Sequence, residues 1–208
     1  MEESCESTVT AALSVGSYTV VYVSGDTIKT ISNTFKYKNL QLPYGLRTLD
    51  FNYESVPTTL ERFSIDPNAP ENTVMYFTVD ANGALCNRDR SVLLLYPTGN
   101  TSENVEIDEG VKIIASSAFK NALFLRYVVI NGPVTISSNA FEGCLNLTNV
   151  TFASSTPSLL AGYSIFYNCG NLDKIYVPSG SLDAYKAMII YDRVIIEKYL
   201  AESPAPAN

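Results

Sequence analysis

A repeat with a period of 22 to 25 residues runs through the second half of this chain. Phe119, Phe141 and Phe166 mark three successive units, and further positions keep the same two spacings. These positions hold a leucine (Leu125, Leu147, Leu172) and a branched apolar residue (Val128, Val150, Ile175). Several positions that share one period are hard to obtain by chance, so the repeat limits the fold more than any other feature.

Each unit ends in a short alternating pattern, L-x-x-V-x-I, which predicts a β-strand. In the first unit the pattern places Val128 and Ile130 inward and Val129 outward. Corresponding strands should stack as neighbours in a parallel sheet. The period lies within the roughly 20 to 29 residues of leucine-rich repeats. We therefore expect an α/β fold: a right-handed leucine-rich-repeat solenoid, dominated by strands, with short helical turns and a stacked parallel sheet.

Two segments, FEGCLNLTNVTF at 141–152 and FYNCGNLDKIYVP at 166–178, resemble the BspA-like leucine-rich repeats. Cys144 and Cys169 stand at that family's cysteine position, where the first unit has Ala122. The ending IYVPSGSLDAYKA is similar to the segment that closes such arrays, and YFTVDANGALCNRDRSVLLLYPTGN is similar to the family's hairpin and Tyr-Pro-x-Gly connector. The resemblance covers residues 60–187, and LQLPYGLRTLDF reads as a degenerate unit before them.

Three parts of the chain follow from this pattern. Residues 41–200 are expected to form the solenoid with its C-terminal cap. Residues 1–40, where SYTVVYV predicts a strand, form either an N-terminal cap that shields the open core or an unrelated small subdomain. Residues 201–208, with Pro and Ala and no apolar periodicity, are expected to be disordered.

The composition excludes several classes of function. The chain has no histidine, which removes the usual base of a Ser or Cys nucleophile and the commonest metal ligand, so we expect no enzyme, metal or cofactor. A net charge of -7 without basic runs argues against nucleic acid. No apolar stretch is long enough to span a membrane as a helix, and no signal peptide is visible.

Four local motifs each allow two interpretations. The Asp80-x-Asn82-Gly83 segment fits a hairpin turn better than a calcium loop, because further ligands are not at the required spacing. Cys144 and Cys169 are interpreted as buried thiols rather than a disulfide. The N-x-Ser/Thr triplets that begin at Asn100, Asn146 and Asn149 are either glycosylation acceptors or chance occurrences. A stretch of acidic residues, Glu103, Glu106, Asp108 and Glu109, is either a solvated connector between coils or contains a glycosidase-like acid and base pair.

The strands also predict a binding surface, because outward residues of stacked strands align in columns. The two expected columns are Tyr127, Asn149 and Lys174, and Val129, Thr151 and Tyr176. Tyrosine is common in binding surfaces, although its strand propensity explains these positions equally well. The family resemblance implies a secreted or cell-surface protein, often associated with adhesion, that binds an extracellular protein or glycan. A passive spacer of a longer surface protein and, last, a carbohydrate-active enzyme are the alternatives.

Overall fold

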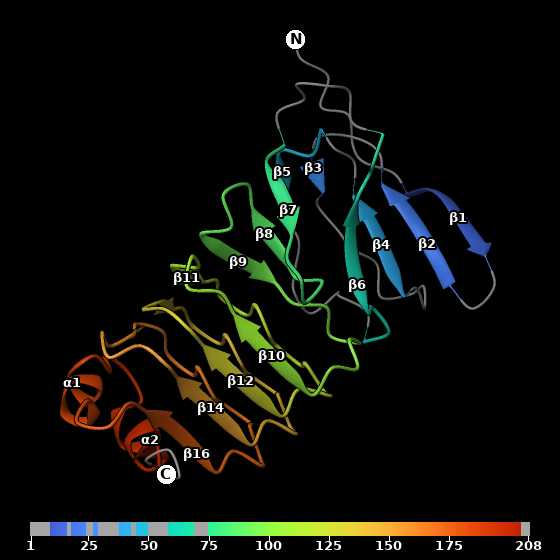
Figure 1. Cartoon of the computed structure of the whole chain (residues 1–208). Helices are drawn as coiled ribbons and strands as arrows, with labels where there is room; N and C mark the ends of the chain where they lie inside the picture. The colour runs from blue at the N-terminus through green and yellow to red at the C-terminus, as the bar shows by residue number, and fades with distance from the viewer. Residues whose placement is uncertain are drawn as a thin grey trace.

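The computed structural model of the chain describes residues 9–15, 18–23, 27–28, 38–42, 45–49, 58–68 and 75–204. These residues form a strand-dominated solenoid of stacked parallel strands with few helices (Figure 1). Its strands are β1 (Val9–Val15), β2 (Tyr18–Val23), β3 (Thr27–Ile28), β4 (Asn39–Leu42), β5 (Thr48–Leu49), β6 (Arg62–Ile65), β7 (Phe77–Val79), β8 (Leu85–Asn87), β9 (Val92–Leu95), β10 (Asn104–Ile107), β11 (Ile113–Ile114), β12 (Tyr127–Ile130), β13 (Thr135–Ile136), β14 (Asn149–Phe152), β15 (Leu159–Leu160), β16 (Lys174–Val177) and β17 (Leu200–Glu202).

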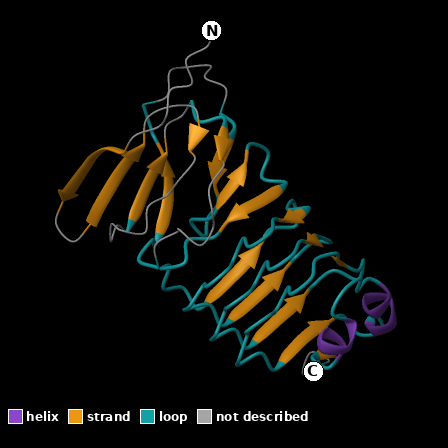
Figure 2. Cartoon of the chain, turned by 180° about the vertical axis from the view of Figure 1, so that it is seen from behind, coloured by secondary structure: helices purple, strands orange, loops and turns teal. Residues whose placement is uncertain are grey.

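Each regular coil contains a long strand, a short strand and a turn segment, as in β12, β13 and the turn that follows them. The long strands form a five-stranded sheet in the order β10-β12-β14-β16-β17, and the short strands join a six-stranded sheet in the order β15-β13-β11-β9-β8-β7. The stacked arrangement of the long strands is clear from behind as well (Figure 2). The predicted parallel stacking is thus confirmed for β10, β12, β14 and β16.

The core of the regular coils is built from the residues that define the repeat. Val128 and Ile130 are buried and Val129 is half-buried, which confirms the predicted direction of each. The aromatic residues form one continuous stack: the ring centroids of Tyr96 and Phe119 are 4.9 Å apart, those of Phe119 and Phe141 are 4.9 Å apart, and those of Phe141 and Phe166 are 5.5 Å apart. Such offset stacks add to the hydrophobic burial of each ring.

Backbone hydrogen bonds tie the turn segments of neighbouring coils together. The Phe119 amide donates to the carbonyl of Ala140 at 2.7 Å, and the Phe141 amide donates to the carbonyl of Ile165 at 2.9 Å. Buried amides need such partners, since an unpaired one loses a hydrogen bond to water without replacement. Each coil therefore satisfies the polar backbone of the coil before it.

Two short helices and a last strand close the array at its C-terminal end (Figure 2). Helix α1 (Leu182–Ala187) buries Tyr185, whose hydroxyl donates to the carbonyl of Ser154 at 2.7 Å. Helix α2 (Arg193–Glu197) buries Ile196. Strand β17 then pairs in parallel with β16.

The structure corrects the expected start of disorder at residue 201. Ala201 and Glu202 lie in β17, and the Ser203 amide donates to the carbonyl of Val177 at 2.8 Å. The free edge of β16 supplies backbone partners that outweigh the lack of an apolar pattern. Residues 205–208 of the expected tail lie outside the described residues.

The upstream half is less regular. Strands β4 and β6 pair in parallel, as expected for degenerate units, and β2 adds to the same sheet beside an antiparallel partner, β1. The boundary expected after residue 40 falls inside β4. A second, smaller cluster of buried residues fills this region, namely Leu40, Leu42, Leu46, Leu60, Phe63, Leu85 and Leu95.

The hairpin predicted around Asn82-Gly83 joins β7 and β8, which pair antiparallel. An Asn-Gly pair is typical of a two-residue turn with a positive φ at both positions, whereas in this turn only Gly83, at φ 77°, has one. The Asp80 carboxylate explains the difference, because it accepts hydrogen bonds from the amides of Asn82 at 2.9 Å and Ala84 at 2.8 Å. This longer turn needs the left-handed conformation at one residue only.

Candidate binding face of the five-stranded sheet

The six residues predicted to form a binding surface do align across the sheet. Tyr127 lies opposite Asn149 and Asn149 opposite Lys174, while Val129 lies opposite Thr151 and Thr151 opposite Tyr176. All six side chains reach the surface, and Tyr127 is the most open of the two tyrosines, at 38% exposure. The geometry of both columns is therefore as the repeat predicts, and their role in binding stays a prediction.

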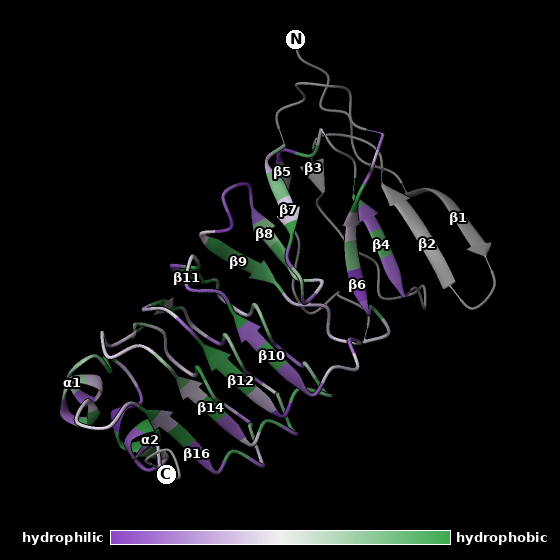
Figure 3. Ribbon diagram, in the orientation of Figure 1, coloured by the Kyte–Doolittle hydropathy of each residue, from purple (hydrophilic) through white to green (hydrophobic). Residues whose placement is uncertain are grey.

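Each column is longer than the sequence pattern indicated. Asn104 lies opposite Tyr127, and Glu106 lies opposite Val129, so the sheet adds one polar residue to the start of each column. The alternation of VEI at 105–107 was the available signal, since it places Val105 and Ile107 inward. Strand β12, in contrast, is largely hydrophobic (Figure 3). The face thus combines a central apolar strand with polar neighbours.

A surface pocket of about 470 Å³ lies where these strands begin. The residues that line it are Glu103, Phe124, Arg126, Asn146, Thr148 and Asn171. Three of them, Glu103, Arg126 and Thr148, directly precede β10, β12 and β14. The sequence gives no signal for this pocket, because its residues come from turn positions whose side-chain directions depend on the conformation of the coil.

Arg126 connects the pocket to the tyrosine column. Its guanidinium lies 3.7 Å from the carboxylate of Glu103 and 5.6 Å from the centre of the Tyr127 ring. A guanidinium over an aromatic ring makes a favourable cation–π contact. The pocket and the column therefore share one contact residue, Arg126.

Amide groups supply the other polar contacts of the pocket. The Asn146 side chain donates to the carbonyl of Leu123 at 2.6 Å, and the Asn171 side chain lies 3.5 Å from the Asn146 amide oxygen. Amides offer donors and acceptors on one group, and the exposed ring of Phe124 lies beside them. This mixture can contact sugar hydroxyls or a peptide backbone.

The cysteines of the repeat contribute to packing and lie away from this face. Cys144 and Cys169 are free and buried, as interpreted from the sequence. Each thiol donates to a carbonyl of the preceding coil, Cys144 to that of Phe119 and Cys169 to that of Phe141, both at 3.0 Å. Burial raises the pKa of the Cys144 thiol well above its ordinary value, so the neutral form that donates this bond is favoured.

The remaining motifs have local structural explanations. The Asp80 carboxylate is occupied by the turn amides described above, and burial raises its pKa. The Asn100 side chain accepts a bond from the Ser102 amide at 2.9 Å and donates one to the carbonyl of Asn82 at 2.9 Å. Of the acidic stretch, Glu103 pairs with Arg126. The described residues contain no group of three or more ligands that could hold a metal ion.

One family model matches the part of the chain that carries the regular coils. Residues 98–197 match the BspA type leucine rich repeat region, in 6 copies. Residues 98–197 of the chain therefore form a BspA-type leucine-rich repeat region. This family consists of repeat proteins, and the match indicates no catalytic family.

Solved structures of bacterial leucine-rich repeat proteins are also similar. One, from Eubacterium ventriosum, is 18% identical with a TM-score of 0.49, and covers 79% of this chain and 48% of its own. A leucine rich cell surface protein from Faecalibacterium prausnitzii is 18% identical with a TM-score of 0.34, covering 77% and 54%. The pneumococcal vaccine antigen PcpA is 12% identical with a TM-score of 0.37, covering 86% and 72%. The chain spans about half the length of the first two.

None of the curated proteins compared with the chain matches it. Across the part of the chain that the structure describes, no helix has the length and apolar character needed to cross a membrane.

Proposed function

We propose that this BspA-type repeat chain is a secreted or cell-surface module that binds a protein or glycan in adhesion, through the outer face of its five-stranded sheet. The observation that carries the proposal is the alignment of the two columns beside the 470 Å³ pocket, with Arg126 contacting both. Binding surfaces favour tyrosine, whose large ring is fixed by two side-chain torsions, and arginine, whose planar guanidinium offers several hydrogen-bond donors.

The shape of the site fits an extended ligand. Parallel strands repeat the same outward positions from coil to coil, so a ligand that lies across β10, β12, β14 and β16 meets one side chain of each column on every strand. A linear glycan or an extended peptide has this form. Tyr127 and Tyr176 would contact its apolar faces, and Asn149, Lys174 and Thr151 its polar groups.

We also propose the arrangement that supports this role. Residues 41–200 form the solenoid with its C-terminal cap, wound right-handed as in an α/β leucine-rich repeat, and residues 1–40 cover its first coil. The parallel pairing of β2 with β4 supports a capping role, because it places a strand from the first 40 residues on an otherwise open sheet edge.

The test is the binding of the purified chain to a glycan array and to immobilised extracellular matrix proteins. The Tyr127→Ala, Tyr176→Ala double variant should lose at least about tenfold in affinity, since truncation of a central aromatic contact typically costs about 1 to 2 kcal/mol or more. The matched control, Tyr163→Ala with Tyr191→Ala, removes two exposed rings that lie on neither the sheet nor the pocket and should bind as the original chain does.

Two results would count against the proposal. Saturable binding that the double variant keeps would move the site away from the columns. If the folded chain binds neither the glycan array nor the matrix proteins, the alternative is favoured, a passive spacer within a longer surface protein.

A further inference from the structure

The turn segment of the last regular coil has no following coil, so some of its backbone amides lack the hydrogen-bond acceptors that earlier coils have. In the coil before it, the amides of Asn139, Phe141 and Gly143 donate to the carbonyls of Tyr163, Ile165 and Tyr167, at 2.9 to 3.0 Å. The equivalent donors of the last coil are the amides of Ser164, Phe166 and Asn168. They face the direction in which another coil would lie.

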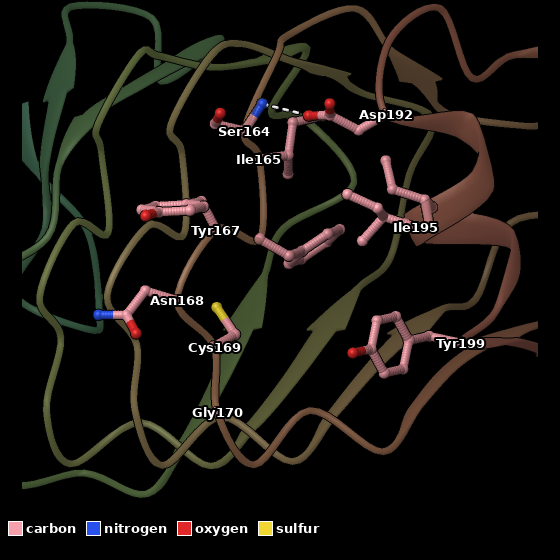
Figure 4. A pocket seen from close by; sticks show the side chains of 11 residues that line it. Ser164, Ile165, Tyr167, Asn168, Cys169, Gly170, Asp192, Ile195 and Tyr199 are labelled. Atoms are coloured by element: carbon pink, nitrogen blue, oxygen red, sulfur yellow. Dashed lines mark hydrogen bonds between the residues drawn. The ribbon is translucent and has the colours of Figure 1, made fainter.

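Only the first of these three donors has a partner among the described residues. The Ser164 amide donates to the carboxylate of Asp192, which takes the place of a carbonyl from a following coil (Figure 4). The amides of Phe166 and Asn168 donate to no described group. Two backbone donors are therefore open at positions that the two preceding coils use for bonds to the next coil, through Phe119 and Asn121 and through Phe141 and Gly143.

These two donors border a pocket of about 360 Å³ between the last turn segment and helix α2. Its apolar wall comes from Phe166, Tyr167, Ile195, Ile196 and Tyr199 (Figure 4). Two of these side chains are well exposed, Tyr167 at 65% and Ile195 at 58%. The volume is within the roughly 300 to 1,000 Å³ of ordinary ligand sites.

We propose that this pocket binds an extended peptide segment of a partner protein, which offers two main-chain carbonyls on either side of one apolar side chain. The carbonyls accept from the Phe166 and Asn168 amides, and the apolar side chain packs between Phe166 and the residues of α2. This site is separate from the sheet face, so the proposal goes beyond the binding role inferred above.

The internal precedent decides which ligand fits. In the preceding interface, Ile165 and Tyr167 present their carbonyls to Phe141 and Gly143, and the Phe166 side chain between them stacks on Phe141. A peptide in the pocket would continue the same interface by one step, as strand addition does at a sheet edge. The two open backbone groups of the site are amide donors, so a ligand that presents carbonyl acceptors fits them.

The probe is a fluorescein-labelled, amidated peptide with the sequence of residues 138–145 and Cys144→Ser, which carries the carbonyls of Ala140 and Glu142 around Phe141. Its control is the same peptide with Phe141→Ala. Fluorescence anisotropy with the full chain should show saturable binding of the probe, and at least about tenfold weaker binding of the control, since a buried aromatic side chain is a typical anchor.

Two variants of helix α2 locate the site. Ile195→Glu places a charge in the apolar wall and should weaken the probe by at least about tenfold. Val194→Glu is the matched control, because Val194 is 85% exposed on the same helix and does not line the pocket. The Tyr127→Ala, Tyr176→Ala variant should keep full peptide binding, which separates this proposal from the one about the sheet.

Amide hydrogen exchange by NMR gives a second readout that needs no variant. In the free chain, the amides of Phe166 and Asn168 should exchange faster than those of Phe141 and Gly143, and bound peptide should slow both. The proposal is overturned if the probe does not bind, if Ile195→Glu leaves binding unchanged, or if binding leaves both exchange rates as they were. Self-association of the chain that Ile195→Glu abolishes would assign the pocket to a second copy and overturn it too.

Discussion

The coils from β10 to β16 and the upstream strands β4 and β6 share parallel pairing, but the two regions differ in how they fill their cores. The regular coils place one aromatic ring per turn in a single stack. The upstream strands instead surround Phe63 with leucines and insert the antiparallel pair β7 and β8. Where the period is strict, each core side chain packs against the equivalent side chain of the next coil. Where the period is broken, equivalent side chains are missing, so each core contact involves a different pair of residues.

The largest expected effect comes from breaking the aromatic stack. Phe141 is fully buried between two rings, so Phe141→Ala should lower the free energy of unfolding by about 3 to 5 kcal/mol, from lost burial and the cavity left behind. Urea unfolding measures this directly. A loss under about 1 kcal/mol, the size of a surface substitution, would contradict the position of Phe141 in the stack.

Phe63→Ala sharpens the comparison, because Phe63 belongs to the upstream cluster. Hydrogen exchange should then speed up around β4 and β6 while β12 and β14 keep their protection. An equal loss of hydrogen-exchange protection in both regions would mean that the two cores unfold as one unit.

A smaller effect is expected from adding a methyl group where the backbones of two neighbouring coils lie close together. A Cβ atom on Gly162 would lie 2.2 Å from the backbone nitrogen of Ser138, so the coils would have to separate. Gly162→Ala should therefore reduce stability by about 1 to 3 kcal/mol, the usual range for overpacking. Gly110 has open space around its Cβ position, so Gly110→Ala is the matched control in the same thermal melts and should change little. Equal melting temperatures for both variants would argue against the close approach.

The smallest effect concerns the hairpin. Burial raises the pKa of the Cys86 thiol from 9.0 to about 12. The unfolded chain then releases this proton at lower pH than the folded chain does. The contribution of the protonated thiol to folding stability is therefore fully present below pH 9 and is lost as pH rises towards 12. Between about pH 8 and about pH 10, ionisation of this thiol in the unfolded chain should lower the free energy of unfolding by about 1 kcal/mol.

Denaturant unfolding of the original chain and of Cys86→Ala at both pH values isolates this contribution. The variant should lose less stability on going to the higher pH. Identical pH dependence in the two proteins would mean that the Cys86 thiol ionises as easily in the folded hairpin as in the unfolded chain.

The binding face shows what a repeat can predict without a structure. The two columns of Tyr127, Asn149 and Lys174, and of Val129, Thr151 and Tyr176, lie in the expected register because side chains alternate along a strand and stacked units share a phase. The pocket beside them was not predictable. Arg126 and Asn146 belong to turn segments, whose side-chain directions follow from loop geometry rather than from any period.

The sequence alone determined the period, the inward residues of each strand, the buried thiols and the parallel stacking, because these depend on local alternation and on identical units packing in the same way. Only the tertiary structure decided how the repetition stops. Residues far apart in the chain meet there: Asp192 takes the place of a following coil at Ser164, and β17 covers the edge of β16. A terminal coil lacks the neighbour that defines all the others, so its contacts cannot be copied from the repeat.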